Sequence, residues 1–162
     1  MLAIDVGAAE TEAFWREFLR SLVKRGLAGV RLVVSDAHEG LKSAIGHVLA
    51  CPWQRCTVHF LREALGHCRK DAQGMVAVAI RPIFTAESAE EARRLLGETI
   101  ARLERPLPKV AHILVEAEED VLAFYAFPAA HRSKLRSTNR SSGSIARSAA
   151  AVSTTRSRKL GK

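Results

Sequence analysis

The chain has 162 residues, of which 48% are hydrophobic and 26% are charged. This is the composition of an ordinary soluble domain with a packed core, and it excludes disorder along the whole chain. No apolar run approaches the roughly 18 residues that a membrane-spanning helix needs. The first twelve residues hold acids but no cation, unlike a signal peptide. We therefore expect a cytoplasmic protein without membrane contact, whose three cysteines, Cys51, Cys56 and Cys68, stay reduced.

The net charge of +8 is unevenly distributed along the sequence. All 17 acidic residues lie at or before Asp120, whereas the last 42 residues carry nine Lys or Arg and no acid. A cationic end of this kind either attracts nucleic acid or keeps an unfolded segment in solution. Composition alone does not separate these two functions.

The first half of the sequence alternates between strand and helix patterns. A strand is predicted at 1–7 and a helix at 11–25, where apolar side chains recur every three or four residues and Gly26 follows as a cap. The β-branched run at 30–34 predicts a buried strand, and residues 41–49 predict a helix. A short strand at 53–58 and a helix at 60–70 follow. This order predicts an α/β sheet.

From residue 71 the pattern becomes helical. Ser88 and Glu91 form a capping box ahead of an alanine- and leucine-rich helix that reaches Leu103. Two prolines interrupt the pattern, and residues 110–127 predict another helix. After Asn139 the sequence consists mainly of Arg, Ser, Ala, Thr and Gly without apolar periodicity. The predicted organisation is an α/β part at 1–70, an all-α part at 71–139 and a disordered basic tail at 140–162.

Asp36 is the strongest single candidate for chemistry. It follows the predicted buried strand in the loop SDAHEGL (residues 35–41), and ligands of open α/β sheets gather outside the carboxyl ends of the strands. A carboxylate there can hold a divalent cation or act in catalysis, and it can equally cap the helix that follows. His38 and Glu39 lie in the same loop and are weaker candidates.

Cys56 and His59 form a second candidate, spaced as Cys-x-x-His. This pair supplies two ligands, whereas a structural zinc site takes four. The residues that could complete such a site are Cys51, His67 and Cys68. The simpler interpretation is a buried thiol and a histidine that is hydrogen-bonded in the core.

The segment RSKLRSTN (residues 132–139) is a third candidate. It mixes basic and hydroxyl side chains, which suit phosphate oxygens. The same segment could equally be the end of a helix.

Seven short motifs follow one another along the chain in a distinctive order. The first four are EAFW (12–15), RGLAGV (25–30), SDAHEGL (35–41) and WQRCTVHF (53–60). The later three are FP (127–128), HR (131–132) and STN (137–139). In this order and spacing they resemble the Mutator-type transposases of bacterial insertion sequences. The resemblance extends from about residue 2 to residue 139.

The resemblance implies a ribonuclease H-like catalytic core, of which residues 1–70 would be a part, with an inserted helical region. Such a core uses two Asp and one Glu to bind two Mg²⁺ ions, which serve in cutting and rejoining phosphodiester bonds. Asp36 matches the second Asp of this triad and would be a catalytic residue and a metal ligand. Cys56 and His59 match the family's Cys-x-x-His signature. The implied partners are DNA at insertion-element ends and another copy of the chain or an intact transposase, which would place the protein at the nucleoid.

The chain departs from the family pattern at both ends. The family's first Asp and its N-terminal DNA-binding region lie upstream of the point where this sequence starts, and Asp5 belongs to a different motif. The Glu is expected soon after residues 137–139 in a stretch resembling PLERLN, whereas residues 140–147 read RSSGSIAR. One choice of codons restores NPLERLNRE when a single base is added after the Asn139 codon. We therefore expect a frameshift there and an inactive transposase fragment that holds one of the three acids.

Two alternatives stay open from the sequence. The chain could be a small non-catalytic DNA-binding protein that acts through the tail at 140–162, with an affinity that falls steeply with salt. It could also fail to fold stably, because strands near Met1 and Val30 without neighbours would expose apolar edges.

Overall fold

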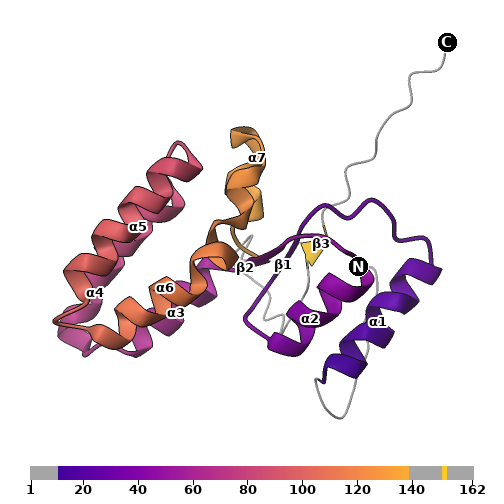
Figure 1. Cartoon of the computed structure of the whole chain (residues 1–162), viewed down its shortest axis with the longest axis horizontal. Helices are drawn as coiled ribbons and strands as arrows, with labels where there is room; N and C mark the ends of the chain where they lie inside the picture. Colours follow the sequence, from indigo (N-terminus) through magenta and orange to yellow (C-terminus); the bar gives the residue numbers. More distant parts are fainter. Residues whose placement is uncertain (1–10, 139–150, 153–162) are drawn as a thin grey trace.

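The computed structural model describes residues 11–138 and 151–152 (Figure 1). The strand predicted at 1–7 lies outside the described residues, and so does the tail predicted at 140–162 except for Ala151–Val152. Both therefore stay predictions. In the part of the chain that the structure describes, no helix is long and apolar enough to cross a membrane.

A small sheet occupies the middle of the molecule (Figure 1). Its strands, in spatial order, are β2 (Trp53–Arg55), β1 (Val33–Ser35) and β3 (Ala151–Val152). β1 runs parallel to β2, so that Ser35 lies opposite Arg55, and antiparallel to β3. The expectation that the strand near Val30 lacks neighbours is wrong, because β1 is paired on both sides.

Two helices, α1 (Glu12–Lys24) and α2 (Glu39–Val48), pack together beside the sheet (Figure 1). The hydroxyl of Thr11 accepts a hydrogen bond from the backbone N–H of Phe14 at 3.3 Å, which caps the start of α1. Gly26 stops the helix with a φ of 98°, a left-handed conformation that glycine adopts without strain. The buried side chains of α1 are Trp15, Leu19 and Leu22.

The contact between α1 and α2 depends on a missing side chain. A Cβ added to Gly40 would lie 2.9 Å from the backbone nitrogen of Glu12, closer than real Cβ atoms approach. The first turns of the two helices therefore touch directly. Around them lies a compact apolar core formed by Trp15, Leu19, Leu22, Val33, Leu41, Ala44, Ile45 and Trp53.

The remaining chain builds a helical half. Its elements are α3 (Thr57–Gly66), α4 (Lys70–Ile80), the 3₁₀ turn η1 (Arg81–Phe84), α5 (Ala89–Leu103), α6 (Pro108–Leu122), the 3₁₀ turn η2 (Ala123–Ala126) and α7 (Ala129–Leu135). They enclose a second, larger core to which every helix from α3 to α6 contributes. Phe60 and Phe124 are its largest fully buried side chains. Because Phe60 belongs to α3, the helical core begins directly after the sheet rather than at residue 71.

The small sheet among helices is compatible with the predicted α/β fragment, and several element boundaries differ from the predicted ones. The Ser88 hydroxyl accepts a hydrogen bond from the Glu91 N–H at 3.1 Å, which confirms the predicted cap of α5. The strand predicted at 53–58 ends at Arg55, because the chain turns at Cys56 into α3. The helix predicted at 60–70 accordingly begins at Thr57 and ends at Gly66. The helix predicted at 110–127 ends as the turn η2.

Gln54 joins the sheet to the helical half. Its side chain is completely buried on β2. Nε2 donates hydrogen bonds to the carbonyl oxygens of Arg55 at 2.6 Å and Val121 at 3.0 Å, and Oε1 accepts one from the N–H of Phe124 at 2.8 Å. The Val121 and Phe124 groups lie where α6 gives way to η2, so that Gln54 satisfies backbone groups left open at this junction.

We expect Gln54→Met to lower the free energy of unfolding by roughly 3 kcal/mol, because it leaves the buried Val121 carbonyl and Phe124 N–H without these partners. Urea denaturation followed by circular dichroism measures the change. Gln73→Met is the matched control, since Gln73 is only half-buried and donates to carbonyl groups without accepting. Equal losses in the two variants would contradict a special role for Gln54.

Candidate functional site

Asp36 lies at the carboxyl end of β1, directly after three buried residues. Its side chain is 53% exposed, and Oδ1 accepts a hydrogen bond from the backbone N–H of Ala37 at 2.9 Å. The alternative in which Asp36 caps the following helix is wrong. His38 caps α2 instead, with its Nδ1 accepting from the N–H of Leu41 at 3.1 Å.

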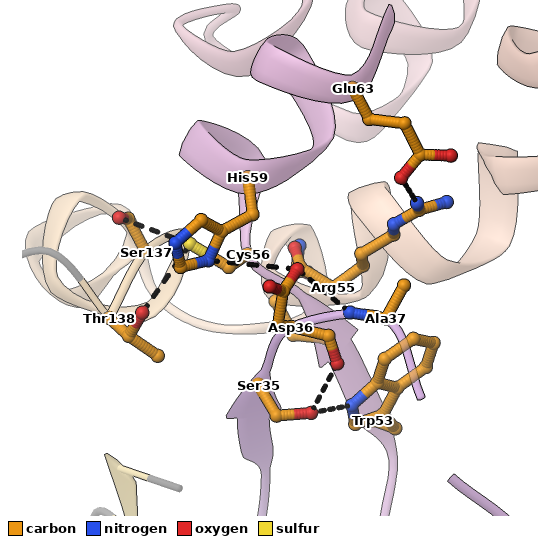
Figure 2. A network of polar contacts seen from close by, with 11 residues as sticks. Ser35, Asp36, Ala37, Trp53, Arg55, Cys56, His59, Glu63, Ser137 and Thr138 are labelled. Atoms are coloured by element: carbon orange, nitrogen blue, oxygen red, sulfur yellow. Dashed lines mark hydrogen bonds and ion pairs between the residues drawn. The ribbon is translucent and has the colours of Figure 1, made fainter. Parts of the chain in front are cut away.

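A tryptophan and a serine on neighbouring strands hold the backbone before this loop. The Oγ of Ser35 accepts a hydrogen bond from Nε1 of Trp53 at 2.7 Å and donates one to the carbonyl of Asp36 at 2.9 Å (Figure 2). The N–H of Cys56 donates to the carbonyl of Ser35 at 2.8 Å. Sequence reasoning missed Ser35 and Trp53 in this role, because their contact depends on the pairing register of β1 and β2.

His59 lies beside Asp36, although the two belong to different predicted motifs (Figure 2). The Nδ1 of His59, in the first turn of α3, is 3.7 Å from Oδ1 of Asp36. This nitrogen is buried and makes no hydrogen bond within the described residues. The two groups form an ion pair when the imidazole is protonated. On the next turn of α3, Glu63 pairs with Arg55.

Cys56 connects the start of α3 to the residues that follow α7. Its side chain is completely buried. The Sγ atom lies 3.5 Å from the hydroxyl oxygens of both Ser137 and Thr138, and the Thr138 hydroxyl donates to it (Figure 2). The N–H of Thr57 donates to the carbonyl of Arg136 at 2.9 Å. Residues about eighty positions apart in the sequence are thereby held together.

The hydrogen bonds to Cys56 favour its thiolate. Burial by itself raises the pKa of Cys56. Hydrogen bonds from the hydroxyl groups of Ser137 and Thr138 and from the backbone N–H groups of His59 and Thr138 lower the pKa by more than burial raises it, to about 7. Burial alone dominates at the other two cysteines and raises the pKa of Cys51 and Cys68. The contacts with Ser137 and Thr138 therefore distinguish Cys56 from an ordinary core thiol.

The described residues do not form a metal site by themselves. No group of three His, Cys, Asp or Glu side chains within residues 11–138 and 151–152 is placed to hold an ion. The zinc alternative is therefore not supported, because Cys51, His67 and Cys68 do not join Cys56 and His59. Mg²⁺ dehydrates reluctantly and is held by carboxylates together with substrate phosphates, so Asp36 on its own supplies only part of such a site.

The basic segment after residue 131 is engaged in holding the fold. α7 ends at Leu135, which agrees with the helix-end alternative for this segment. Arg132 donates to three backbone carbonyl groups, those of Glu87, Tyr125 and Phe127. Arg136 donates to the carbonyl of Phe84 at 2.9 Å. Arg132 is thus committed to carbonyl oxygens rather than free for phosphate.

Comparison with known proteins finds a matching family and several similar proteins. The family described as "Transposase, Mutator family" matches residues 1–145. The chain is 42% identical over 141 residues to the transposase for insertion sequence element IS406 of Burkholderia multivorans, which covers 86% of this chain and 36% of that protein. It is 36% identical over 140 residues to the ISRM5 transposase of Rhizobium meliloti, covering 86% and 35% of the two proteins.

A further relative is the IS1081 transposase of Mycobacterium tuberculosis, which is 41% identical over 129 residues, covering 79% of this chain and 31% of that protein. The chain thus spans about a third of the length of the curated relatives it matches. The matched residues include the whole of the site drawn in Figure 2.

The hydrogen-bonded thiolate predicts a pH-dependent stability. The pKa of Cys56 in the folded chain, about 7, is below the ordinary value of 9.0. The ionised thiolate therefore stabilises the folded state fully above about pH 9, and this stabilisation is lost as the pH falls through 7. We expect the difference in free energy of unfolding between the wild type and Cys56→Ala to grow by on the order of 2 kcal/mol from about pH 6 to pH 9.

Cys68→Ala is the control, because burial raises the pKa of Cys68, so its contribution should not grow with pH and should begin to fall as the pH approaches 9. Denaturant titrations at several pH values measure both differences. A constant difference for Cys56→Ala would contradict the hydrogen-bonded thiolate.

Proposed function

Because this chain belongs to the Mutator family of transposases, we propose that it carries part of a DDE-type transposase site and contributes Asp36 to it. The observation that carries the proposal is the position of Asp36, at the carboxyl end of a buried strand and next to the Cys-x-x-His signature. Such strand ends are where open α/β sheets bind their ligands. The parallel pairing of β1 and β2 across α2 supports a ribonuclease H-like core as the proposed origin of the sheet.

The proposed substrate is the DNA at the ends of an insertion element, and the reaction is phosphodiester cleavage followed by strand transfer. Bound Mg²⁺ would supply the activation of the attacking oxygen and the stabilisation of the leaving oxygen. Ala37 N–H and His59 both lie at Oδ1 of Asp36, so that Oδ2 is the oxygen left for a cation. His59 would act by orienting the carboxylate.

The chain by itself is proposed to be inactive. The sequence contains no acid after Asp120, so no Glu follows residues 137–139 where the family's third ligand is expected. A single carboxylate binds Mg²⁺ weakly, because this ion keeps its waters unless several ligands replace them. A second copy of the chain or an intact transposase would be the partner that completes a site.

A second candidate function is DNA binding without catalysis, favoured by the separation of charge along the sequence. Residues 121–162 hold nine cations and no acid, whereas residues 1–120 hold sixteen cations and seventeen acids. DNA binding through this end would weaken steeply with salt and would be lost when residues 140–162 are removed. Equal binding by the shortened chain would overturn this candidate.

We expect no cleavage of a DNA duplex that carries insertion-element ends when the purified chain is incubated with Mg²⁺ or Mn²⁺. Gel electrophoresis of end-labelled DNA measures the result. Cleavage by the wild type that is lost in Asp36→Asn would show that the chain is active on its own. Cleavage that survives this substitution would show that Asp36 is not part of the responsible site.

A chimaera tests the role of Asp36 directly. Residues 11–138 replace the matching segment of the Burkholderia multivorans transposase, and transposition is counted in cells. We expect Asp36→Asn to abolish transposition by the chimaera, by about 10³-fold or more, as expected for loss of a metal ligand that positions both reacting oxygens. Asp71→Asn is the control, since Asp71 is an exposed acid in the first turn of α4. Equal activity of the two variants would contradict the proposed role.

A further inference from the structure

An open groove of about 760 Å³ lies in the helical half of the molecule. Its walls are α3, α4, η1 and the residue that follows α7. Asp36, Cys56 and His59 do not line it. The groove is therefore separate from the candidate site around Asp36, although its lining includes Thr57, the residue directly after Cys56.

The charged side chains that line the groove are all cationic. They are Arg62 of α3, Arg81 of η1 and Arg136, and no acid is found among the described lining residues. The side chains of Arg62 and Arg81 are exposed and make no ion pair or hydrogen bond within residues 11–138 and 151–152. Arg136 is fixed in the wall, because one of its N–H groups binds the Phe84 carbonyl.

Several arginine side chains on the helices are paired with acids. Arg16 pairs with Glu12, Arg55 with Glu63, Arg93 with Glu118 and Glu119, and Arg94 with Glu91 and Glu98. The helix faces that hold these pairs carry both signs of charge. The lining of the groove carries cations alone, and the guanidinium groups of Arg62 and Arg81 in it are complementary to an anion.

Between the arginines the groove is apolar. Leu61 and Leu65 of α3 and Phe84 of η1 line it, together with the hydroxyl groups of Thr57 and Thr85. A small inorganic anion would leave this apolar surface uncovered. A ligand that combines phosphates with flat apolar rings covers both kinds of surface, as in grooves that track single-stranded nucleic acid.

We propose that the groove binds a single DNA strand, with phosphates on Arg62, Arg81 and Arg136 and bases against Leu61 and Leu65. The proposal rests on the proposed function for its choice of DNA as the polymer. A single strand is favoured over a duplex, because a duplex stacks its bases inside and offers the apolar floor only phosphates and sugars. The strand would enter at the start of α3, the helix that also carries His59 to Asp36.

The test is fluorescence anisotropy of a labelled 20-nucleotide DNA strand titrated with the full chain, in EDTA and at several salt concentrations. We expect the double substitution Arg62→Ala with Arg81→Ala to weaken binding about tenfold at low salt. The slope of log affinity against log salt should fall by about 1.4, since each phosphate contact to a single strand contributes about 0.7.

The control is Arg20→Ala with Arg105→Ala, which removes the same charge from exposed arginines outside the groove. Both double variants keep residues 121–162, so that any binding by the cationic end is common to them. Equal weakening in the two double variants, or none in either, would overturn the groove. A third variant, Thr85→Glu, places an acid at an exposed position in the groove and should weaken binding in the same way.

Two further comparisons separate this proposal from the proposed function. A duplex of the same sequence should bind less tightly, and the groove pair and the control pair of arginine substitutions should weaken its binding to the same extent. If the groove pair weakens duplex binding as much as it weakens single-strand binding, the single-strand assignment is wrong. Asp36→Asn should leave the affinity unchanged in EDTA. If Asp36→Asn leaves transposition by the chimaera unchanged while the groove substitutions still weaken strand binding, the proposed role of Asp36 is wrong and the proposed binding groove is retained.

Discussion

The buried amide of Gln54 fixes how the two halves of this molecule meet. It binds the backbone on both sides of the α6–η2 junction from a strand that is only three residues long. Lys42 of α2 adds a second link, with Nζ 2.7 Å from Oδ2 of Asp120 on α6. Because α3 starts two residues after β2 ends, the anchoring of β2 also sets where the first turn of α3 points. The placement of His59 beside Asp36 depends on that anchoring.

The candidate site is a meeting point of three segments that are distant in the sequence. β1 leads to Asp36, the first turn of α3 brings His59, and the residues that follow α7 reach Cys56. The Cys-x-x-His signature thus contacts two different segments from one helical turn. Its cysteine accepts hydrogen bonds from hydroxyl and backbone N–H groups, and its histidine faces a carboxylate. The described residues bring no group of three His, Cys, Asp or Glu side chains together here that could hold a metal ion.

Sequence patterns predicted an element well where contacts between near neighbours in the sequence determine it. The helix at 11–25 and the capping box at Ser88 follow from contacts between near neighbours in the sequence, and both appear in the structure. The end of the strand at Arg55 was missed, because residues typical of strands, such as Thr57 and Val58, continue after it while the backbone already turns into α3. Asp36 could be found from its place after a buried strand. The contacts of Cys56 with Ser137 and Thr138 could not, because they depend on how the whole helical half folds back.

The absence of a side chain at Gly40 restricts what can stand at this position. The first turns of α1 and α2 are so close that a Cβ at residue 40 would lie 2.9 Å from the backbone nitrogen of Glu12. Any larger residue there would push the start of α1 away from α2 and loosen the apolar core that the two helices share.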